Sequence, residues 1–215
     1  MSAPLEIRPY RPSDREGLYE VCVRTGDNGA DAAALYPDPR ILPDIFVGPY
    51  LALEPELAFV LAESEGAGRP VGYILGTADT AAFVARYRAR WLPGVADRYP
   101  GDGARERELR HPEWMLWPEA AGHPAHLHID LLPEAQGRGH GRQLMRTYLD
   151  ALAAAGVGAV HLSMGEANHA ARAFYDRLGF TELARRGGGV LMGRATADGQ
   201  TVTPKSVAMP TRPEA

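Results

Sequence analysis

Seven short stretches of the chain have the apolar, strand-like composition that predicts β-strands, and residues 160–164 show the alternation of a two-residue period most clearly. The stretches cover residues 5–9, 58–63, 71–77, 126–132, 160–164, 180–185 and 190–194. In four other regions apolar residues recur every three or four positions, which predicts amphipathic helices. These regions cover residues 13–25, 79–91, 142–155 and 168–178. Strands and helices are therefore mixed along the whole chain.

Residues that cap helices set the boundaries of these elements. Ser13 followed by Glu16 predicts a capping box, with Ser13 at the N-cap of the first helix. Asn168 is a good N-cap for the last helix. Gly156 and Gly179 are placed to end two helices, because glycine tolerates the left-handed conformation found at helix C-termini.

Two segments between the predicted elements are rich in proline and indicate insertions. The first covers about residues 26–57 and predicts short helices and turns. The second covers about residues 79–124 and begins with a helix whose aromatic residues recur four apart, which predicts a buried stripe. These aromatic residues are Phe83, Tyr87 and Trp91. We expect the rest of this insertion, residues 93–124, to cover a site rather than to form core. The simplest organisation is one domain over residues 1–195, followed by a tail over 196–215.

Composition and charge exclude several classes of protein. The net charge of −4 over 215 residues gives no general attraction to nucleic acid or to anionic membranes. Cys22 is the only cysteine, so an intrachain disulfide and a cysteine-based zinc cluster are excluded. The first ten residues lack the apolar region of a secretory signal, and no apolar run approaches the roughly 20 residues that span a bilayer. We expect a cytoplasmic protein.

A glycine-rich segment, residues 136–141, joins a predicted strand to a predicted helix. Backbone N–H groups at such a turn, together with the positive end of the helix dipole, favour an anion such as a pyrophosphate. A dinucleotide-binding turn would need glycine where Arg142 stands, and a P-loop would need Gly-Lys-Ser/Thr at its end. The pattern Gln136-x-x-Gly139-x-Gly141 instead resembles the coenzyme A loop of the GNAT superfamily of N-acetyltransferases. A glycine-rich turn that binds no ligand would also fit the pattern.

Two further groups of residues extend this resemblance. Asn168 and Tyr175 belong to an Asn…Phe-Tyr-x-x-x-Gly-Phe pattern that resembles the second GNAT signature. Segments that look like the C-terminal acetyltransferase-like domain of animal O-GlcNAcases are residues 7–10, 26–32, 46–51 and 91–93. The resemblance implies an α/β (α+β) domain with the GNAT fold, in which a mixed central sheet of about seven strands is flanked by helices and splayed between its two central strands. It indicates a free-standing, bacterial-type member that binds acetyl-CoA, without a glycosidase domain.

The resemblance also implies which residues hold acetyl-CoA, the expected cosubstrate, with no metal involved. Backbone groups of Leu131 and Leu132 would hold the pantetheine arm, next to a bulge that splays this strand from the next. Family members often use the signature asparagine, here Asn168, to contact the coenzyme. They often use the signature tyrosine, here Tyr175, as the acid that protonates the CoA thiolate. The residues expected around the pyrophosphate are Gln136, Gly137, Arg138, Gly139, His140, Gly141 and Arg142.

The group that accepts the proton of the amine is left open by the sequence. His126, His128 and Asp130 alternate along one face of the predicted strand, and His128 and Asp130 are the favoured candidates. The family's usual base positions fall on Leu127 and Ala125, one residue out of register, so a bulge would be needed to restore the match. The three side chains could also lie on a solvated face or bind a metal ion. Other carboxylates that could line an acceptor site are Glu54, Glu56, Asp79 and Glu113.

Two functions fit these residues. The first is transfer of an acetyl group from acetyl-CoA to a primary amine by direct attack, with a small molecule or a peptide as the acceptor. The second is a catalytically idle module that binds acetyl-CoA or docks a partner. The intact glycine loop together with Tyr175 favours the enzyme. The acceptor stays open among polyamines, aminoglycosides, amino sugars and protein lysines, and the resemblance allows a homodimer.

Overall fold

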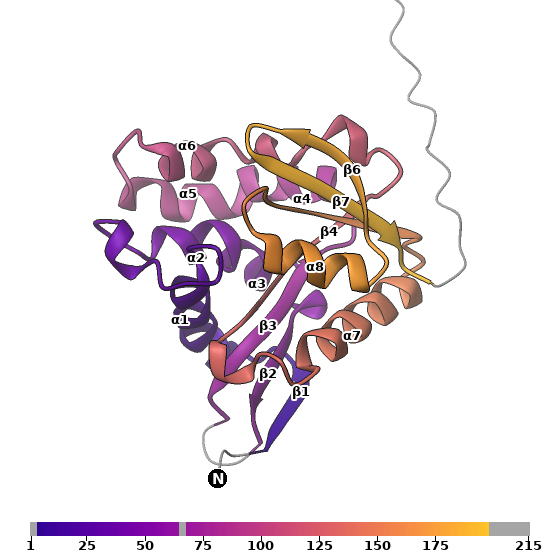
Figure 1. Cartoon of the computed structure of the whole chain (residues 1–215). Helices are drawn as coiled ribbons and strands as arrows, with labels where there is room; N and C mark the ends of the chain where they lie inside the picture. Colours follow the sequence, from indigo (N-terminus) through magenta and orange to yellow (C-terminus); the bar gives the residue numbers. More distant parts are fainter. Residues whose placement is uncertain (1–3, 65–67, 198–215) are drawn as a thin grey trace, which may run out of the picture.

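A seven-stranded sheet forms the centre of the computed structural model, which describes residues 4–64 and 68–197 (Figure 1). The strand order is β1-β2-β3-β4-β5-β7-β6, and the central pair β4–β5 is parallel while the other pairs are antiparallel. The strands are β1 (Leu5–Pro9), β2 (Phe59–Glu63), β3 (Pro70–Thr77), β4 (Ala125–Leu131), β5 (Ala159–Gly165), β6 (Thr181–Arg186) and β7 (Gly189–Ala195). The helices are α1 (Arg15–Thr25), α2 (Ile41–Phe46), α3 (Gly48–Leu53), α4 (Thr80–Arg86), α5 (Leu92–Val95), α6 (Ala104–Arg110), α7 (His140–Ala154) and α8 (His169–Arg177). The predicted mixed sheet is confirmed.

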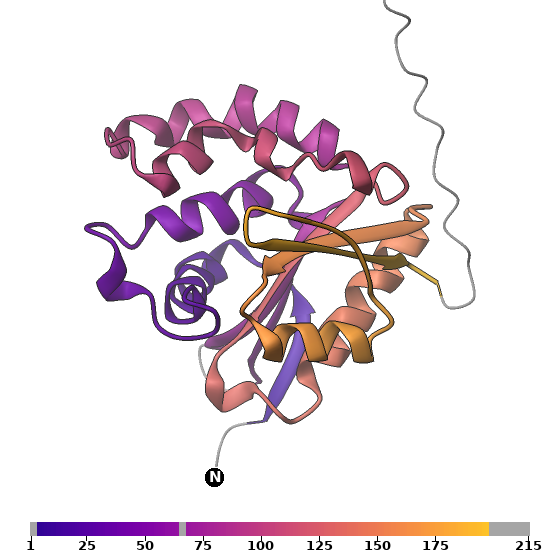
Figure 2. The same ribbon diagram turned by 45° about the horizontal axis from the view of Figure 1, so that its top comes forward.

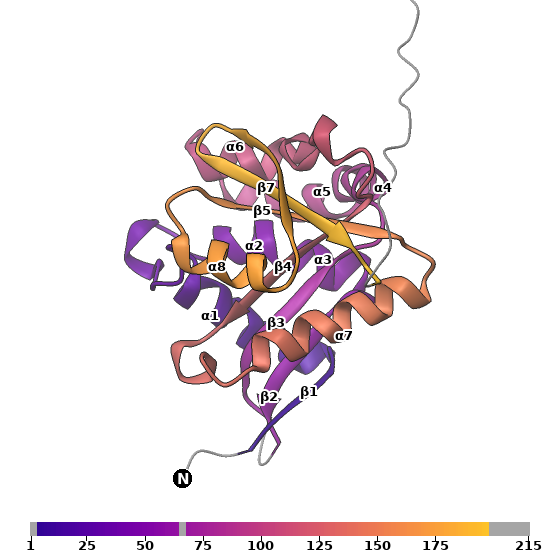
Figure 3. The same cartoon turned by 45° about the vertical axis from the view of Figure 1, so that its right-hand side comes forward.

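Helices cover both faces of the sheet. Helix α7 packs on β2, β3 and β4, as Figure 3 shows, and the Tyr148 hydroxyl donates to the carbonyl of His126 (2.9 Å). Helix α1 packs on the opposite face of β3 and β4, where Cys22 lies next to Tyr73. The buried apolar face predicted for α7 is confirmed at Leu144, Met145, Tyr148, Leu149 and Leu152. The core therefore lies on both sides of the sheet.

The central strands β4 and β5 separate soon after they meet. They pair through only two residues of β4, Ala125 and His126, although each strand has seven residues. Beyond that point β4 continues beside β3 and β5 continues beside β7, so their facing edges are open. β4 keeps an unbroken register with β3 along residues 126–131. The predicted splay is confirmed, but the predicted bulge is wrong, because the strands separate by divergence.

The two insertions contain α2 and α3, and α4 to α6, which gather along one side of the molecule (Figure 2). The expectation that residues 93–124 form a cover rather than core is wrong, since Leu109 and Met115 belong to the main hydrophobic core. The predicted aromatic stripe is confirmed, because Phe83, Tyr87 and Trp91 are all buried. Residues 87–91 form a π-helical turn between α4 and α5.

Asp44 of α2 ties these insertions to α1. Its carboxylate is fully buried and accepts hydrogen bonds from the hydroxyls of Tyr19 and Tyr99, both at 2.7 Å. The guanidinium of Arg98 donates to the same carboxylate (3.1 Å). The backbone carbonyl of Asp44 accepts from the indole N–H of Trp91 (2.9 Å). One residue therefore joins a sheet-packing helix to both insertions.

The ends of the helices agree with the sequence except at α1. Ser13 lies in a 3-10 turn and Asp14 precedes the first residue of α1, so the predicted capping box at Ser13 is wrong. The carboxylate of Asp14 accepts a backbone N–H from three residues earlier (2.8 Å). The cap at Asn168 is confirmed by the backbone N–H that donates to its Oδ1 (3.0 Å). Gly156 and Gly179 have left-handed φ values of 77° and 78°, as helix-ending glycines do.

The described chain ends just beyond β7. The Thr196 hydroxyl donates to the carbonyl of Val157 (2.7 Å), which fixes this end against the connection between α7 and β5. The remainder of the predicted tail, residues 198–215, lies outside the described residues. Within the described ranges, no helix has the length and hydropathy that would suit a membrane crossing.

Candidate functional site

The glycine loop between β4 and α7 leaves a row of backbone N–H groups free. Gly137 and Gly139 have φ values of 74° and 86°, a left-handed conformation that favours glycine. The N–H groups of residues 137–142, which include the first turn of α7, have no acceptor among the described residues. The Gln136 amide donates to the carbonyl of Leu131 (2.8 Å) and closes the loop. The loop thus presents donors and a helix dipole to an anion.

A cavity of about 590 Å³ lies in front of this loop, and we call it the loop cavity. Most residues predicted to hold the coenzyme line it, namely Leu131, Gln136, Gly137, Gly139, Gly141, Arg142, Asn168 and Tyr175. Arg138, His140 and Leu132 are not among its lining residues, and His140 Nδ1 lies 3.2 Å from the carbonyl of Ala135. A side chain at Gly141 would place its Cβ 3.2 Å from the ring of Phe174, so glycine permits the close approach of α7 and α8.

The sequence predicted that backbone groups of Leu131 and Leu132 face the open edge of β4, and the structure differs at Leu132. The Leu132 N–H donates to the carbonyl of Val71 (2.9 Å), and its own carbonyl accepts from Ala135 (2.9 Å). The backbone N–H and C=O groups of successive residues point to opposite edges of a strand. Because those of Leu132 point toward β3, the groups of Ile129 and Leu131 point toward β5. Assigning the pantetheine contact to Leu132 is therefore wrong. Ile129 was missed because the sequence does not show which residues of a strand pair with which neighbour.

A second cavity of about 230 Å³ adjoins the loop cavity on the side of α1 and α2, and we call it the α2 cavity. The two cavities share Asp130, Asn168 and Tyr175. His128 also lines the α2 cavity. The structure therefore brings the three predicted catalytic side chains, His128, Asp130 and Tyr175, to one place.

Asp130 is a partly buried carboxyl group at the junction of the two cavities. The Tyr73 hydroxyl of β3 donates to it (2.6 Å). Burial raises the pKa of Asp130 to about 6, although hydrogen bonds from Tyr73 and Thr25 oppose the rise. A carboxyl group with such a pKa exchanges protons near neutral pH. No sequence pattern pointed to Tyr73 or Thr25, because they come from β3 and α1.

Tyr175 is the buried residue of α8, with 8% of its surface exposed. Its ring lies between those of Phe174 and Phe180, at centroid distances of 5.3 and 5.5 Å. Burial, and to a smaller degree the charge of Asp130, raise the pKa of its hydroxyl, so it is protonated at neutral pH. Among the described residues no group hydrogen-bonds to this hydroxyl, and it is not sealed from the cavities. Tyr175 is thus a core aromatic residue whose hydroxyl is left available.

His126 and His128 lie on the same face of β4, where His126 is buried and His128 is partly buried. The Tyr50 hydroxyl of α3 lies 2.7 Å from His126 Nε2 and 3.0 Å from His128 Nε2. Burial is the main cause that lowers the pKa of His126 well below its usual value and that of His128 to about 4. Both rings are therefore neutral at pH 7. The interpretation of this strand face as a solvated surface is wrong for His126, which is buried, whereas His128 and Asp130 are partly exposed.

The remaining candidate residues are less well placed to accept a proton or to bind a metal ion. Ala125 and Leu127 are buried on the opposite face of β4, and the unbroken register provides no bulge to turn them. The four other candidate carboxylates line neither cavity, and they are Glu54, Glu56, Asp79 and Glu113. Glu54 accepts from Thr77 (2.6 Å) instead. Over residues 4–64 and 68–197, no group of three or more His, Cys, Asp or Glu side chains is placed to hold a metal ion.

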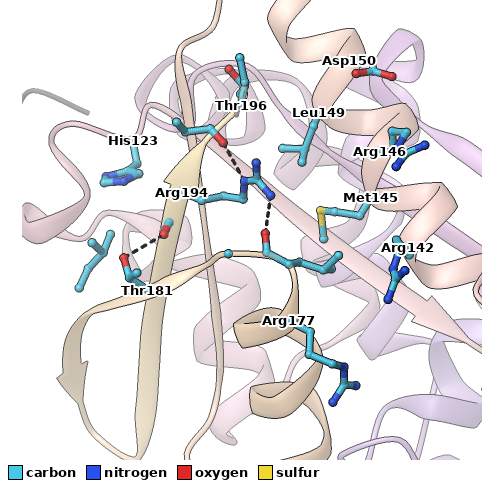
Figure 4. Close-up of a pocket in the computed structure, with 16 residues that line it drawn as sticks. His123, Arg142, Met145, Arg146, Leu149, Asp150, Arg177, Thr181, Arg194 and Thr196 are labelled. Atoms are coloured by element: carbon cyan, nitrogen blue, oxygen red, sulfur yellow. Dashed lines mark hydrogen bonds between the residues drawn. The ribbon is translucent and has the colours of Figure 1, made fainter. Parts of the chain in front are cut away.

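A groove of about 1140 Å³ runs from the loop along α7 toward β7 (Figure 4). Arg142 and Arg146 project into it from α7, and Arg177 from the end of α8. None of these three has an ion-pair partner in the described part of the chain, whereas Arg194 donates to the carbonyl of Leu178. Arg142 and Arg177 line the loop cavity as well. The positive surface therefore extends beyond the loop, and the sequence did not indicate Arg146 or Arg177.

Comparison with known proteins finds relatives that cover most of this chain. A family model described as the acetyltransferase (GNAT) family matches residues 30–180. Protein O-GlcNAcase of Rattus norvegicus is 26% identical over 193 residues, which is 85% of this chain and 20% of the rat protein. The chain thus spans about a fifth of the length of the curated relatives that it matches first.

Solved structures show the same fold. The crystal structure of SsHAT superposes with a TM-score of 0.87 at 56% sequence identity, covering 90% of this chain and 99% of that one. The structure of yncA from Salmonella typhimurium, which contains acetyl-CoA, has a TM-score of 0.54 at 16% identity and covers 94% of this chain and 99% of its own. At that identity the second likeness shows the fold alone.

Proposed function

Because the chain belongs to the acetyltransferase (GNAT) family, we propose that it transfers an acetyl group from acetyl-CoA to a primary amine. The observation that carries the proposal is that the loop cavity and the α2 cavity meet at Asp130 and Tyr175. The loop cavity has the chemistry of a pyrophosphate site, and the α2 cavity has room for a small amine or an amine-bearing side chain. A thioester and an amine held there would meet between a proton acceptor and a proton donor.

The residues around the loop cavity fit coenzyme A. The free N–H groups of residues 137–142 would bind the pyrophosphate oxygens, and Arg142 and Arg177 would add positive charge. The backbone groups of Ile129 and the N–H of Leu131 would bind the amide groups of the pantetheine arm along the open edge of β4, since the Leu131 carbonyl already accepts from Gln136. Bound acetyl-CoA supplies the activated acetyl group and a thiol leaving group.

We assign the proton transfers to two side chains. Asp130 takes one proton from the ammonium group and leaves a neutral amine whose lone pair can attack the carbonyl carbon. As the C–N bond forms and the C–S bond breaks, the Tyr175 hydroxyl donates its proton to the sulfur. Tyr175 regains a proton from the nitrogen, which ends as an amide N–H. The reaction then releases one proton, through Asp130.

Acetyl-CoA is expected to stabilise the wild-type protein, and Gly139→Asp is expected to abolish this effect. The aspartate would place a side chain and a negative charge where no atom of the described chain lies within 4 Å of the added Cβ and where the pyrophosphate would bind. Ligand at about 100 times its dissociation constant adds about 2.7 kcal/mol of stability. For a chain of this length, that raises Tm by roughly 5–10 °C. A thermal-shift titration measures the effect.

Gly156→Asp is the matched control, because Gly156 ends the same helix α7 and also has a left-handed φ (77°) with open space around it. Both variants therefore have the same backbone strain and the same added charge. Gly156→Asp should lose intrinsic stability but keep the full ligand-induced shift. Absence of a shift in the wild-type protein would contradict the proposed coenzyme site.

The pH profile of kcat/KM is expected to fall on the acid side as pH decreases through about 6, where Asp130 becomes protonated. The active form is the carboxylate, so activity is present above this pKa and lost below it. Tyr73→Phe removes a hydrogen bond that lowers the pKa, so the acid limb should move to higher pH by about one unit. Asp130→Asn should remove the limb. Identical acid limbs in all three proteins would assign the base elsewhere.

An acceptor screen separates the enzyme from an idle module. CoA release is measured with a polyamine, an aminoglycoside, an amino sugar and a lysine peptide. A protein that binds acetyl-CoA but releases CoA with none of them would support the idle module, and the proposed reaction would be withdrawn.

A further inference from the structure

A chain of hydrogen bonds runs from the start of α4 to the α2 cavity. It begins at the carbonyl of Pro124, passes through Thr80, His126 and Tyr50, and ends at His128. Consecutive polar atoms along it lie 2.8, 2.9, 2.7 and 3.0 Å apart. Thr80, His126 and Tyr50 are all buried. The catalytic steps described above use none of these three residues.

The position of each proton in this chain follows from its fixed end. The carbonyl of Pro124 can only accept, and it accepts the backbone N–H of Thr80 (2.8 Å). The Thr80 hydroxyl oxygen also lies 2.8 Å from it, and two oxygens this close need a proton between them, so the hydroxyl donates to the carbonyl. A hydroxyl has one proton, so Thr80 Oγ1 must accept from His126 Nδ1 (2.9 Å). A neutral His126 that carries its proton on Nδ1 has a lone pair on Nε2.

The same reasoning fixes the tautomer of His128. The Tyr50 hydroxyl has two possible acceptors, His126 Nε2 at 2.7 Å and Met115 Sδ at 3.9 Å. A thioether sulfur is a weak acceptor, so the hydroxyl donates its one proton to the lone pair on His126 Nε2. Tyr50 can then only accept from His128, so the His128 proton is on Nε2 (3.0 Å). His128 Nδ1 therefore has a lone pair, and it is not among the polar atoms sealed inside the described structure. His128 lines the α2 cavity, and we infer that this lone pair faces it.

Asp130 lies two residues along the same strand face and lines the same cavity. Leu42 and Phe46 from α2 and Met164 from β5 add apolar side chains to a wall that also contains Thr25, Asn28, Ser163 and Asn168. A primary ammonium group has several N–H donors and needs several acceptors when it leaves water. A carboxylate beside an imidazole lone pair meets that need.

We propose that His128 Nδ1 and the Asp130 carboxylate form a two-acceptor seat for the primary ammonium group of a compact alkylamine, and that Tyr50, His126 and Thr80 are positioning residues that fix the required tautomer. The inference rests on the proposed acetyl transfer and names its acceptor class. After Asp130 has taken one proton, one of the two remaining N–H bonds donates to His128 Nδ1. The nitrogen lone pair is then free to turn toward the thioester.

Neutral His128 is consistent with its surroundings. The titratable groups that face it are His126 and Asp130 from β4, Tyr50 from α3, His161 from β5 and Cys22 from α1. Burial, and then the nearby His161, lower the pKa of His128 to about 4. Burial keeps the pKa of Tyr50 well above its usual value, so its hydroxyl retains the proton that the chain requires.

Nitrogen NMR of protein labelled with ¹⁵N-histidine tests the tautomers without any activity assay. At pH 7 the wild-type spectrum should show His126 protonated on Nδ1 and His128 protonated on Nε2. Thr80→Ser keeps the hydroxyl and should preserve the His126 tautomer, whereas Thr80→Val should lose it. If His128 of the wild-type protein were protonated on Nδ1, it could not accept a hydrogen bond from the amine, and the proposed two-acceptor seat would be contradicted whatever the activity.

Kinetics at saturating acetyl-CoA test the acceptor class, with n-butylamine and N-methylbutylamine as probes. The wild-type protein should prefer the primary amine by about tenfold or more in kcat/KM, since the secondary amine has one N–H bond fewer. Tyr50→Phe frees the His128 tautomer and should raise KM for butylamine about tenfold, with KM for acetyl-CoA unchanged. Tyr87→Phe, whose buried hydroxyl has no partner among the described residues, is the matched control and should behave as wild type.

The outcomes separate the seat from the reaction itself. Transfer to butylamine with equal preference for both amines would overturn the seat alone. Failure to transfer to any amine, by a protein that still binds acetyl-CoA, would overturn the seat together with the proposed function.

Discussion

Replacing Tyr175 with phenylalanine is expected to lower kcat for acetyl transfer by about a hundredfold while leaving acetyl-CoA affinity nearly unchanged. A positioned general acid contributes about 10²–10⁴ in rate, and a thiolate is a fair leaving group, so the lower end applies. The phenylalanine ring keeps the packing against Phe174 and Phe180. Only the hydroxyl that lines both cavities is removed. Steady-state CoA release with the best acceptor, beside a binding titration, measures the two effects separately.

Tyr87→Phe serves as the control for this experiment. It makes the same chemical change at another buried tyrosine, which lies in the π-helical turn and lines neither cavity. Its kcat should equal that of the wild-type protein. If Tyr175→Phe also kept the wild-type kcat, the hydroxyl would have no part in the reaction and Tyr175 would be a core residue only.

Asp44→Ala is expected to lower the free energy of unfolding by about 2–5 kcal/mol. The change leaves the buried hydroxyls of Tyr19 and Tyr99 without their acceptor, and each unsatisfied buried group costs about 1–3 kcal/mol. The pair with Arg98 adds little, because half of the Arg98 side chain is exposed. Chemical denaturation followed by far-UV circular dichroism measures the loss.

Asp97→Ala is the matched control, since Asp97 is an exposed carboxylate in the same insertion as Tyr99. Its effect should stay within about 0.5 kcal/mol, as for most surface substitutions. An Asp44 variant as stable as the Asp97 variant would mean that water satisfies the two tyrosines and that the insertions are held by apolar packing alone.

Local patterns predicted the fold where one element determines its own structure. Short strand-like stretches located all seven strands. The apolar face of α7 and the cap at Asn168 were correct because both depend on residues within one helix. The capping box at Ser13 failed because Asp14 took the capping role in a preceding 3-10 turn. The core role of Leu109 and Met115 was missed because it depends on contacts between an insertion and the rest of the fold.

In the candidate site, too, the sequence predicted what depends on contiguous residues and missed what depends on contacts between distant elements. The glycine loop and Tyr175 could be found because their motifs are contiguous in sequence. Ile129, in contrast, faces the open edge only because β4 pairs with β3 in one particular register. Tyr50 and Tyr73 reach the histidines and Asp130 from α3 and β3, far away in sequence. No periodicity in the chain encodes such a meeting.

The shared wall of the two cavities also bears on how this protein could be inhibited. Asp130, Asn168 and Tyr175 line both spaces, so no separate barrier of residues stands between a ligand in one and a ligand in the other. A single molecule that joins a coenzyme A thiol covalently to an alkylamine would lose its rigid-body freedom only once on binding. Its second half would then bind at an effective concentration set by a short linker, typically in the millimolar range. Such a tethered compound should bind far more tightly than either half.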